Sequence, residues 1–149
     1  NRLNKIDSAT DMGVTALQGD YVSSEAPAGD VNEAIYITRR VALDNPATGI
    51  KVFLDMNRFA SANVKVMYKI LRSDDASDFD EIGYNFFNTN GSPDNTVNAS
   101  LAATDFKEYE YTENNLDEFI AFSIKIVMQG SNSSEPPRLK DLRALALAT

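Results

Sequence analysis

Hydrophobic and polar residues alternate near the C-terminal end of this chain, within the segment FIAFSIKIVMQG that begins at Phe119. A period of two is typical of a β-strand with one buried face. The face expected in the core carries Phe122, Ile124, Ile126 and Met128, and the face expected toward solvent carries Ser123 and Lys125. A polar loop with Pro136 and Pro137 follows, and a second apolar-rich run reaches almost to the C-terminus. The segment therefore predicts the closing strands of a β-sandwich.

Three earlier runs show the same alternation. In IYITRRVAL, Ile35, Ile37 and Val41 share a face, and the turn Asp44-Asn45-Pro46 is expected to end the strand. The runs GIKVFLDMN and VKVMYKIL follow, with expected core residues Val52, Leu54, Val66 and Tyr68. The loop Arg58–Asn63 between these two runs is too short for the crossover that parallel strands need, so the runs predict an antiparallel pair.

The middle of the chain is less regular. Residues 73–81 form an acidic loop, Tyr84–Phe87 predicts a short strand, and Asn88–Ser100 predicts a long exposed loop because it is dense in Asn, Gly, Ser and Pro. FKEYEYT predicts a further strand, with Tyr109 and Tyr111 on the face opposite Phe106. Roughly seven short strands with turn-rich connections indicate an all-β fold, an antiparallel β-sandwich.

The first part of the chain differs from the rest, because it is polar, contains several Gly and Pro residues and shows little periodicity. We expect residues 1–30 to be an extended arm or linker that packs on neighbours, with a short strand at Asp20–Ser23. Residues 31–149 are then the sandwich domain. Because the chain begins with Asn1 rather than Met, we expect a processed product or a piece of a longer polypeptide.

Composition narrows the range of functions. With 22 acidic and 14 basic residues the net charge is −8, and an acidic surface repels phosphate backbones, so no nucleic-acid partner is expected. No apolar run is long enough to predict a membrane span. The chain has no His and no Cys, which excludes a Ser-His-Asp triad, a thiol nucleophile, a conventional zinc site and disulfides within it.

Acidic clusters are the remaining candidates for chemistry. The loop at residues 73–81 is rich in Asp but lacks the spacing and the Gly of a calcium loop, so we expect Asp side chains that cap backbone amides. A second acidic region, residues 105–118, could pair carboxylates for glycoside hydrolysis, but acidic residues are abundant throughout this chain. We therefore predict no metal, no cofactor and no enzymatic activity.

Arginine and tyrosine residues beside the strands are the candidate contact residues. Arginine is favoured at protein interfaces, where its planar fork pairs with carboxylates, and the candidates are Arg39, Arg40, Arg138 and Arg143. Tyrosines beside polar loops could stack on a sugar, and the candidates are Tyr84, Tyr109 and Tyr111. The alternative for these tyrosines is packing in the core or across strands, where aromatic residues are common.

Four runs in the order YITRRVAL, GIKVFLDMNRFASANVKVMYKIL, FKEYEYT and FSIKIVMQGSNSSEPPRLKDLRALAL cover the chain from about Ile35 to Leu147. In this order they resemble domains in structural proteins of contractile-tailed bacteriophages, especially the large tail and baseplate proteins of phages that infect marine cyanobacteria. The most specific stretch is the last one, in which an apolar strand precedes Ser-Asn-Ser and a closing strand that contains KDLR. The closing pattern also resembles the last strands of galactose-binding-like jelly rolls.

The resemblance implies a virion structural protein, a sandwich module of jelly-roll or galactose-binding-like type in a phage tail or baseplate. Its expected partners are other tail or baseplate proteins, in homo- or hetero-oligomers, and its expected location is the virion after synthesis in the bacterial cytoplasm. No catalytic residues carry over. The alternative, from a different class, is a carbohydrate-binding module that contacts glycans on the host cell surface.

Overall fold

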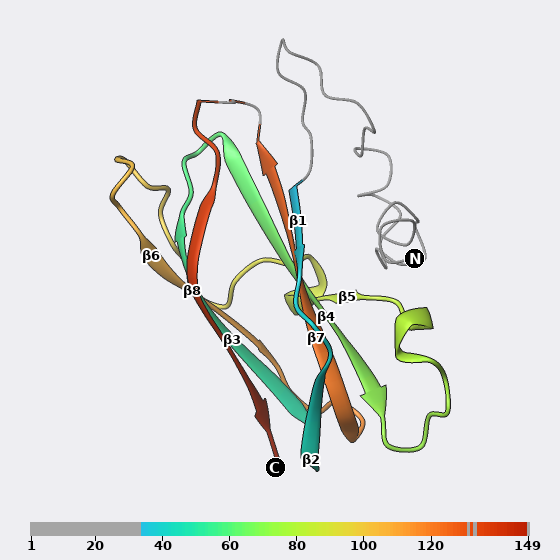
Figure 1. Ribbon diagram of the computed structural model, residues 1–149. Coiled ribbons are helices and arrows are strands. Elements are labelled where there is room, and N and C mark those ends of the chain that lie inside the picture. Colours follow the sequence, from blue (N-terminus) through green and yellow to red (C-terminus); the bar gives the residue numbers. More distant parts are fainter. Residues whose placement is uncertain (1–33, 131, 133, 149) are drawn as a thin grey trace.

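The computed structural model describes residues 34–130, 132 and 134–148, so the expected arm at residues 1–30 and its strand at Asp20–Ser23 lie outside the described residues. The described part folds into two antiparallel β-sheets that pack together (Figure 1). The predicted all-β fold and antiparallel sandwich are confirmed. The strands are β1 (Ala34–Ile37), β2 (Val41–Ala47), β3 (Gly49–Asn57), β4 (Ala62–Arg72), β5 (Asn85–Phe86), β6 (Lys107–Glu113), β7 (Phe119–Gly130) and β8 (Arg138–Leu147). Two short 3-10 helices, η1 (Phe79–Glu81) and η2 (Phe87–Thr89), lie before and after β5. Within the described residues, no helix is long and apolar enough to cross a membrane.

The longest strand, β7, organises the larger sheet. On one side it pairs with β4, which in turn pairs with β5. On the other side it pairs with β2 along its first half and with β1 along its second half. In the smaller sheet, β3 lies between β6 and β8.

The core lies between the two sheets, and on β3, β4 and β7 it is built from the faces that the alternation predicts. Ile35 and Ile37, expected to share a face with Val41, instead pack on the outer face of the larger sheet, whereas Val41 packs against the main core. On β3 the buried apolar side chains are Ile50, Val52, Leu54 and Met56, and on β7 they include Phe122, Ile124 and Ile126. Three aromatic rings meet edge to face in the centre, with centroid distances of 5.0 Å between Tyr68 and Phe87 and 5.9 Å between Phe87 and Tyr111. Such aromatic pairs stabilise a core beyond their buried area.

The predicted antiparallel pair of β3 and β4 is wrong. β3 pairs with β6 and β8, whereas β4 pairs with β7 and β5, so the short connection at residues 58–61 crosses from one sheet to the other. The two strands face each other across the core, where both Leu54 and Val66 are buried. Alternation shows which face of a strand is buried, but two strands that share a core can be neighbours in one sheet or partners across two.

The strand predicted to start at Ile35 is divided in two, and the turn predicted at Asp44-Asn45-Pro46 does not end it. Between β1 and β2, the Thr38 hydroxyl accepts a hydrogen bond of 3.0 Å from the Ile124 amide and so replaces a backbone partner. β2 then continues through Pro46 to Ala47, with an irregularity between Ala42 and Ala47. Because β2 is at the edge of the sheet, a proline without an N–H is tolerated there.

The side of β7 that was expected to face solvent is buried. Lys125 has 0% relative exposure, and Ser123 is buried as well. The segment at residues 73–91, which carries η1 and β5, lies beside β4 on the side of the larger sheet away from the smaller one (Figure 1). From this segment, the rings of Phe79 and Tyr84 pack on the outer face. The Lys125 ammonium lies 5.0 Å from the centroid of the Tyr84 ring, and the Lys69 ammonium lies 4.8 Å from it. The period of two is retained, but both faces of β7 are covered.

The segment at residues 88–100 is less exposed than predicted. Gly91 and Ser100 are buried, and Val97 packs against the core. Gly91 has φ +78°, and a Cβ there would lie 3.0 Å from Phe86 Cδ1 and 3.1 Å from Lys65 Cβ, so only glycine fits this close approach. The predicted short strand at Tyr84–Phe87 is present as β5 but covers only Asn85–Phe86.

Candidate functional site

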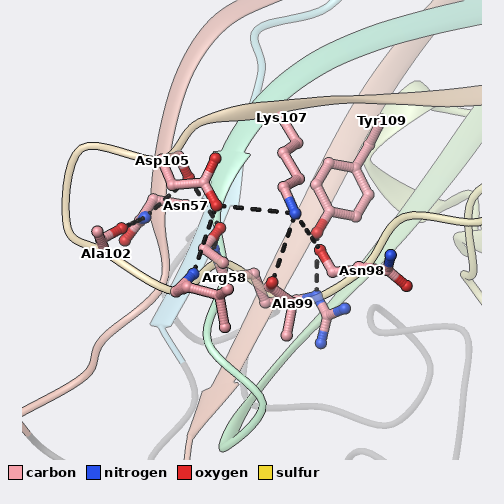
Figure 2. A network of polar contacts seen from close by, with 10 residues as sticks. Asn57, Arg58, Asn98, Ala99, Ala102, Asp105, Lys107 and Tyr109 are labelled. Atoms are coloured by element: carbon pink, nitrogen blue, oxygen red, sulfur yellow. Dashed lines mark hydrogen bonds and ion pairs between the residues drawn. The ribbon is translucent and has the colours of Figure 1, made fainter.

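A polar network fixes the loop before β6 to the end of β3 (Figure 2). The buried Asn57 side chain donates from Nδ2 to the carbonyl oxygens of Ala102, at 2.7 Å, and Asp105, at 2.9 Å. The Ser100 hydroxyl donates to the same Asp105 carbonyl at 2.8 Å and accepts a bond from the Arg58 amide at 3.2 Å. These bonds hold residues 100–105 against the point where β3 turns toward the other sheet.

Two basic side chains extend from this network in different directions (Figure 2). Lys107 donates from Nζ to the carbonyl oxygens of Asn98, at 3.2 Å, and Ala99, at 3.4 Å, and lies 3.7 Å from Asp105 Oδ2. Arg58 instead donates from Nε to the Tyr109 hydroxyl at 3.3 Å. Lys107 therefore fastens the loop to the network, and Arg58 is held over the neighbouring tyrosine.

A hollow of about 300 Å³ opens beside Arg58. Its walls come from the end of β3, the start of β4, the loop at residues 92–97 and β6. Tyr109 and Tyr111, one strand repeat apart on β6, belong to its lining together with Arg58. The Tyr111 hydroxyl is buried and has no hydrogen-bond partner among the described residues. Burial raises the pKa of Tyr111 above its usual value, and Tyr109 adds to the shift.

A second hollow, the β1–β8 groove, opens on another side of the sandwich between the two sheets. Its volume is about 340 Å³. The lining side chains are mostly apolar: Tyr36, Leu54, Ile126, Met128, Leu139, Lys140, Asp141 and Leu142. Tyr36 on β1 and Leu145 on β8 are about half exposed, at 51% and 49%. Asp141 has φ +53°, which marks a local irregularity in β8.

The four arginines predicted as interface residues do not form one cluster. Arg39 and Arg40 are exposed between β1 and β2, and the Arg40 guanidinium lies 5.2 Å from the Phe79 ring. Arg138 and Arg143 lie on β8 in the other sheet. Arg143 Nη2 donates to Glu108 Oε2 at 2.8 Å. Two of the four therefore lie on β8, which also forms one wall of the β1–β8 groove.

The three tyrosines predicted as sugar contacts are buried, with 3%, 2% and 0% exposure for Tyr84, Tyr109 and Tyr111. Tyr84 packs with Met67 and Val127 on the outer face of the larger sheet. Tyr109 and Tyr111 pack in the main core, although they also border the hollow at Arg58. None of the three presents an open ring face to solvent.

The acidic loop caps its own backbone, as predicted. Asp75 Oδ1 accepts from the Ser77 amide at 2.9 Å, and Asp78 Oδ1 accepts from the Asp80 amide at 3.1 Å. Hydrogen bonds from Ser77 lower the pKa of Asp75. Among the residues that the structure describes, no three acidic side chains converge in a way that could hold a metal ion.

Sequence reasoning missed Arg58 and Asn95, which contribute to the hollow and to its covering loop. The Asn95 side chain donates from Nδ2 to the Glu108 carbonyl and accepts from the Glu110 amide, each at 3.0 Å. It thus pairs with the edge of β6 as a neighbouring strand would. The available signal was a cation directly after a buried strand and an Asn-rich loop, but residues 58, 95 and 109 meet only in the folded chain.

Comparison of the chain with models of protein families, with curated proteins and with solved structures found no match.

Proposed function

We propose that this domain is a non-enzymatic structural module of a phage tail or baseplate, and that it assembles by binding an extended segment of a neighbouring subunit along β8. The resemblance of the sequence to virion proteins suggests the setting. The observation that carries the mode of assembly is an open strand edge beside an apolar groove.

The open edge belongs to β8. Among the described strands β8 pairs only with β3, so its other side has no strand neighbour. An edge strand presents unpaired N–H and C=O groups and is a template for pairing with another chain. The last part of β8 reads RALAL, carries no charge after Arg143 and keeps Leu145 about half exposed at 49%. This portion lacks the charged residues that usually protect an exposed edge.

The β1–β8 groove lies beside this strand and would select which side chains of a partner segment fit. A strand that adds to β8 would run beside the opening between the sheets, and every second side chain would point toward the β1–β8 groove. The apolar lining, with Tyr36 and Met128 on one wall and Leu139 and Leu142 on the other, favours an apolar side chain of the partner. Lys140 and Asp141 in the lining could pair with charges on the partner segment.

The test is photo-crosslinking inside the particle. A benzophenone amino acid replaces Leu145, and the chain is produced in bacteria infected by the phage that encodes it. The matched control is Leu101, which is 90% exposed in the loop near Asn57, at the other end of β3 from Leu145. We expect position 145 to cross-link to one segment of another virion subunit and position 101 not to do so. Absence of the chain from purified particles, or equal cross-linking at both positions, would contradict the proposal.

The jelly-roll or galactose-binding-like subtype is part of the same proposal. It is supported by the path of the chain, which crosses from one sheet to the other between β2 and β3, β3 and β4, β5 and β6, β6 and β7, and β7 and β8. Repeated crossing of this kind is typical of double-sheet jelly rolls. An experimental structure of the whole chain, compared strand by strand with jelly rolls, tests it.

A further inference from the structure

The hollow at Arg58 is a second site, separate from the β1–β8 groove, and its lining is suited to a small polar ligand. It lies between the β3–β4 connection and the loop at residues 92–97. Its volume of about 300 Å³ is at the lower end of the range for ligand pockets, so it would accept one small molecule rather than a chain.

Arg58 is the only charged residue in the described lining of this hollow. Its guanidinium is fixed by two bonds, from Nε to the Tyr109 hydroxyl at 3.3 Å and from Nη1 to the Ala62 carbonyl at 3.1 Å. A guanidinium has five N–H donors, so donors remain for a ligand. Because the group is already held in place, a ligand that binds it loses little side-chain entropy in doing so.

The rest of the lining combines hydroxyl and amide groups with an apolar wall. Ser92, Asn95 and Thr96 come from the covering loop, and Met56, Val64 and Val97 supply apolar surface. Tyr111 belongs to the same lining, and its hydroxyl is buried and has no partner among the described residues. A buried polar group without a partner is costly, and a ligand hydroxyl that reached it would remove that cost.

We infer that this hollow binds a single carboxylated sugar unit, a hexuronic acid, with the carboxylate on Arg58 and the ring hydroxyls toward the loop and Tyr111. The guanidinium matches a carboxylate in shape and charge, and the described lining offers no carboxylate of its own to repel the ligand. The mixed polar and apolar walls match a sugar ring, which has hydroxyl groups at its edge and C–H groups on its faces. The inference does not depend on the proposed assembly role.

The test is calorimetric titration of the full chain with glucuronate, methyl glucuronoside, glucose and acetate at about 0.15 M salt, where the repulsion from the net charge of −8 is screened beyond about 8 Å. We expect both glucuronate compounds to bind at least about tenfold more tightly than glucose or acetate. Binding of the free acid alone would mean that the site takes only the free monosaccharide. Binding of the methyl glycoside as well would mean that the site also accepts a hexuronic acid unit at the end of a polysaccharide. Equal affinity for glucose or for acetate, or no binding of glucuronate, would overturn the inference.

The matched variants are Arg58→Gln and Arg143→Gln. Both remove one positive charge, but Arg143 is exposed on β8, pairs with Glu108 and is not part of the hollow. We expect Arg58→Gln to lose about tenfold or more in affinity for glucuronate and Arg143→Gln to bind like the parent chain. Thermal melts of both variants without ligand show whether each is folded. If Arg58→Gln is not folded, Arg58→Lys serves as a second variant, because it keeps the charge but loses the planar fork. Unchanged glucuronate affinity in a folded Arg58 variant would overturn the inference.

Discussion

At the level of single residues, the polar ends of Tyr111 and Tyr109 differ in a way that the structure makes testable. Both tyrosines are buried on the same face of β6. The Tyr109 hydroxyl accepts a bond from Arg58, whereas the Tyr111 hydroxyl has no partner among the described residues. The same chemical group is therefore expected to stabilise the fold at one position and to destabilise it at the other.

Removal of the Tyr111 hydroxyl should stabilise the protein. A buried hydroxyl without a partner costs about 1–3 kcal/mol, so we expect the free energy of unfolding of Tyr111→Phe to rise by about 1 kcal/mol in urea melts. The same change at Tyr109 should lower it by about 0.5–1.5 kcal/mol, because a hydrogen bond is lost. The opposite ranking of the two variants would show that Tyr111 has a partner in solution.

The same hydroxyl should limit stability at high pH. Burial raises the pKa of Tyr111 in the folded chain, whereas the unfolded chain titrates near about 10. The folded state then binds the proton more tightly, so this contribution to stability is complete below about pH 10 and is lost as the pH rises above it. We expect the melting temperature to fall above about pH 10 and to fall less steeply in Tyr111→Phe. Identical pH profiles for the two proteins would contradict this assignment.

Lys125 is buried, although the alternation of the sequence around it predicts a solvent-facing side chain. Read as a solvent-facing residue it could be replaced at little cost, but its methylene groups are buried beside Met67 and Val127 and its ammonium lies over Tyr84. Removal of a buried long side chain loses packing as well as charge. We expect Lys125→Ala to lower the free energy of unfolding by about 2 kcal/mol or more. Lys140→Ala, at an exposed position on β8 where the ammonium lies 4.3 Å from the centroid of the Phe106 ring, should lower it by no more than about 1 kcal/mol. Equal effects would restore the solvent-facing interpretation.

At the level of elements, alternation on β3, β4 and β7 predicted where the strands form and which face enters the core, but not which strands become neighbours. β3 and β7 occur where the pattern places them, because their apolar faces must be buried in any sandwich. The pairing of β3 with β6 and β8 depends on segments far away in the sequence, and local patterns do not record it. For the same reason the hollow at Arg58 could not be predicted, since it needs the loop at residues 92–97 to fold over β6.

Two neighbouring residues of the covering loop bond to the edge of β6: the Asp94 amide donates to the Glu110 carbonyl at 2.7 Å, and the Asn95 side chain makes two further bonds. Asn95 satisfies both the Glu108 carbonyl and the Glu110 amide. We expect Asn95→Ala to lower the free energy of unfolding by about 1–2 kcal/mol. Asn95→Asp keeps the acceptor but loses the donor, so its free energy of unfolding should lie between those of Asn95→Ala and the parent chain. Asn98→Ala is the control, because the loop uses the backbone carbonyl of Asn98 rather than its side chain. Hydrogen exchange should show a faster Glu110 amide in Asn95→Ala, and an unchanged rate would contradict the role given to Asn95.

At the level of the whole molecule, the two sheets share one core, so neither can lose its packing alone. Leu54 on β3 and Ile124 on β7 belong to the same buried cluster although they lie in different sheets. We expect Leu54→Ala and Ile124→Ala each to cost about 2–5 kcal/mol and each to move the whole unfolding transition. Tyrosine absorbance and far-ultraviolet circular dichroism should report one midpoint in every variant, as a two-state domain does. A variant in which one signal melts before the other would mean that the sheets fold separately, and a site that needs both, such as the β1–β8 groove, would then be lost before the protein unfolds.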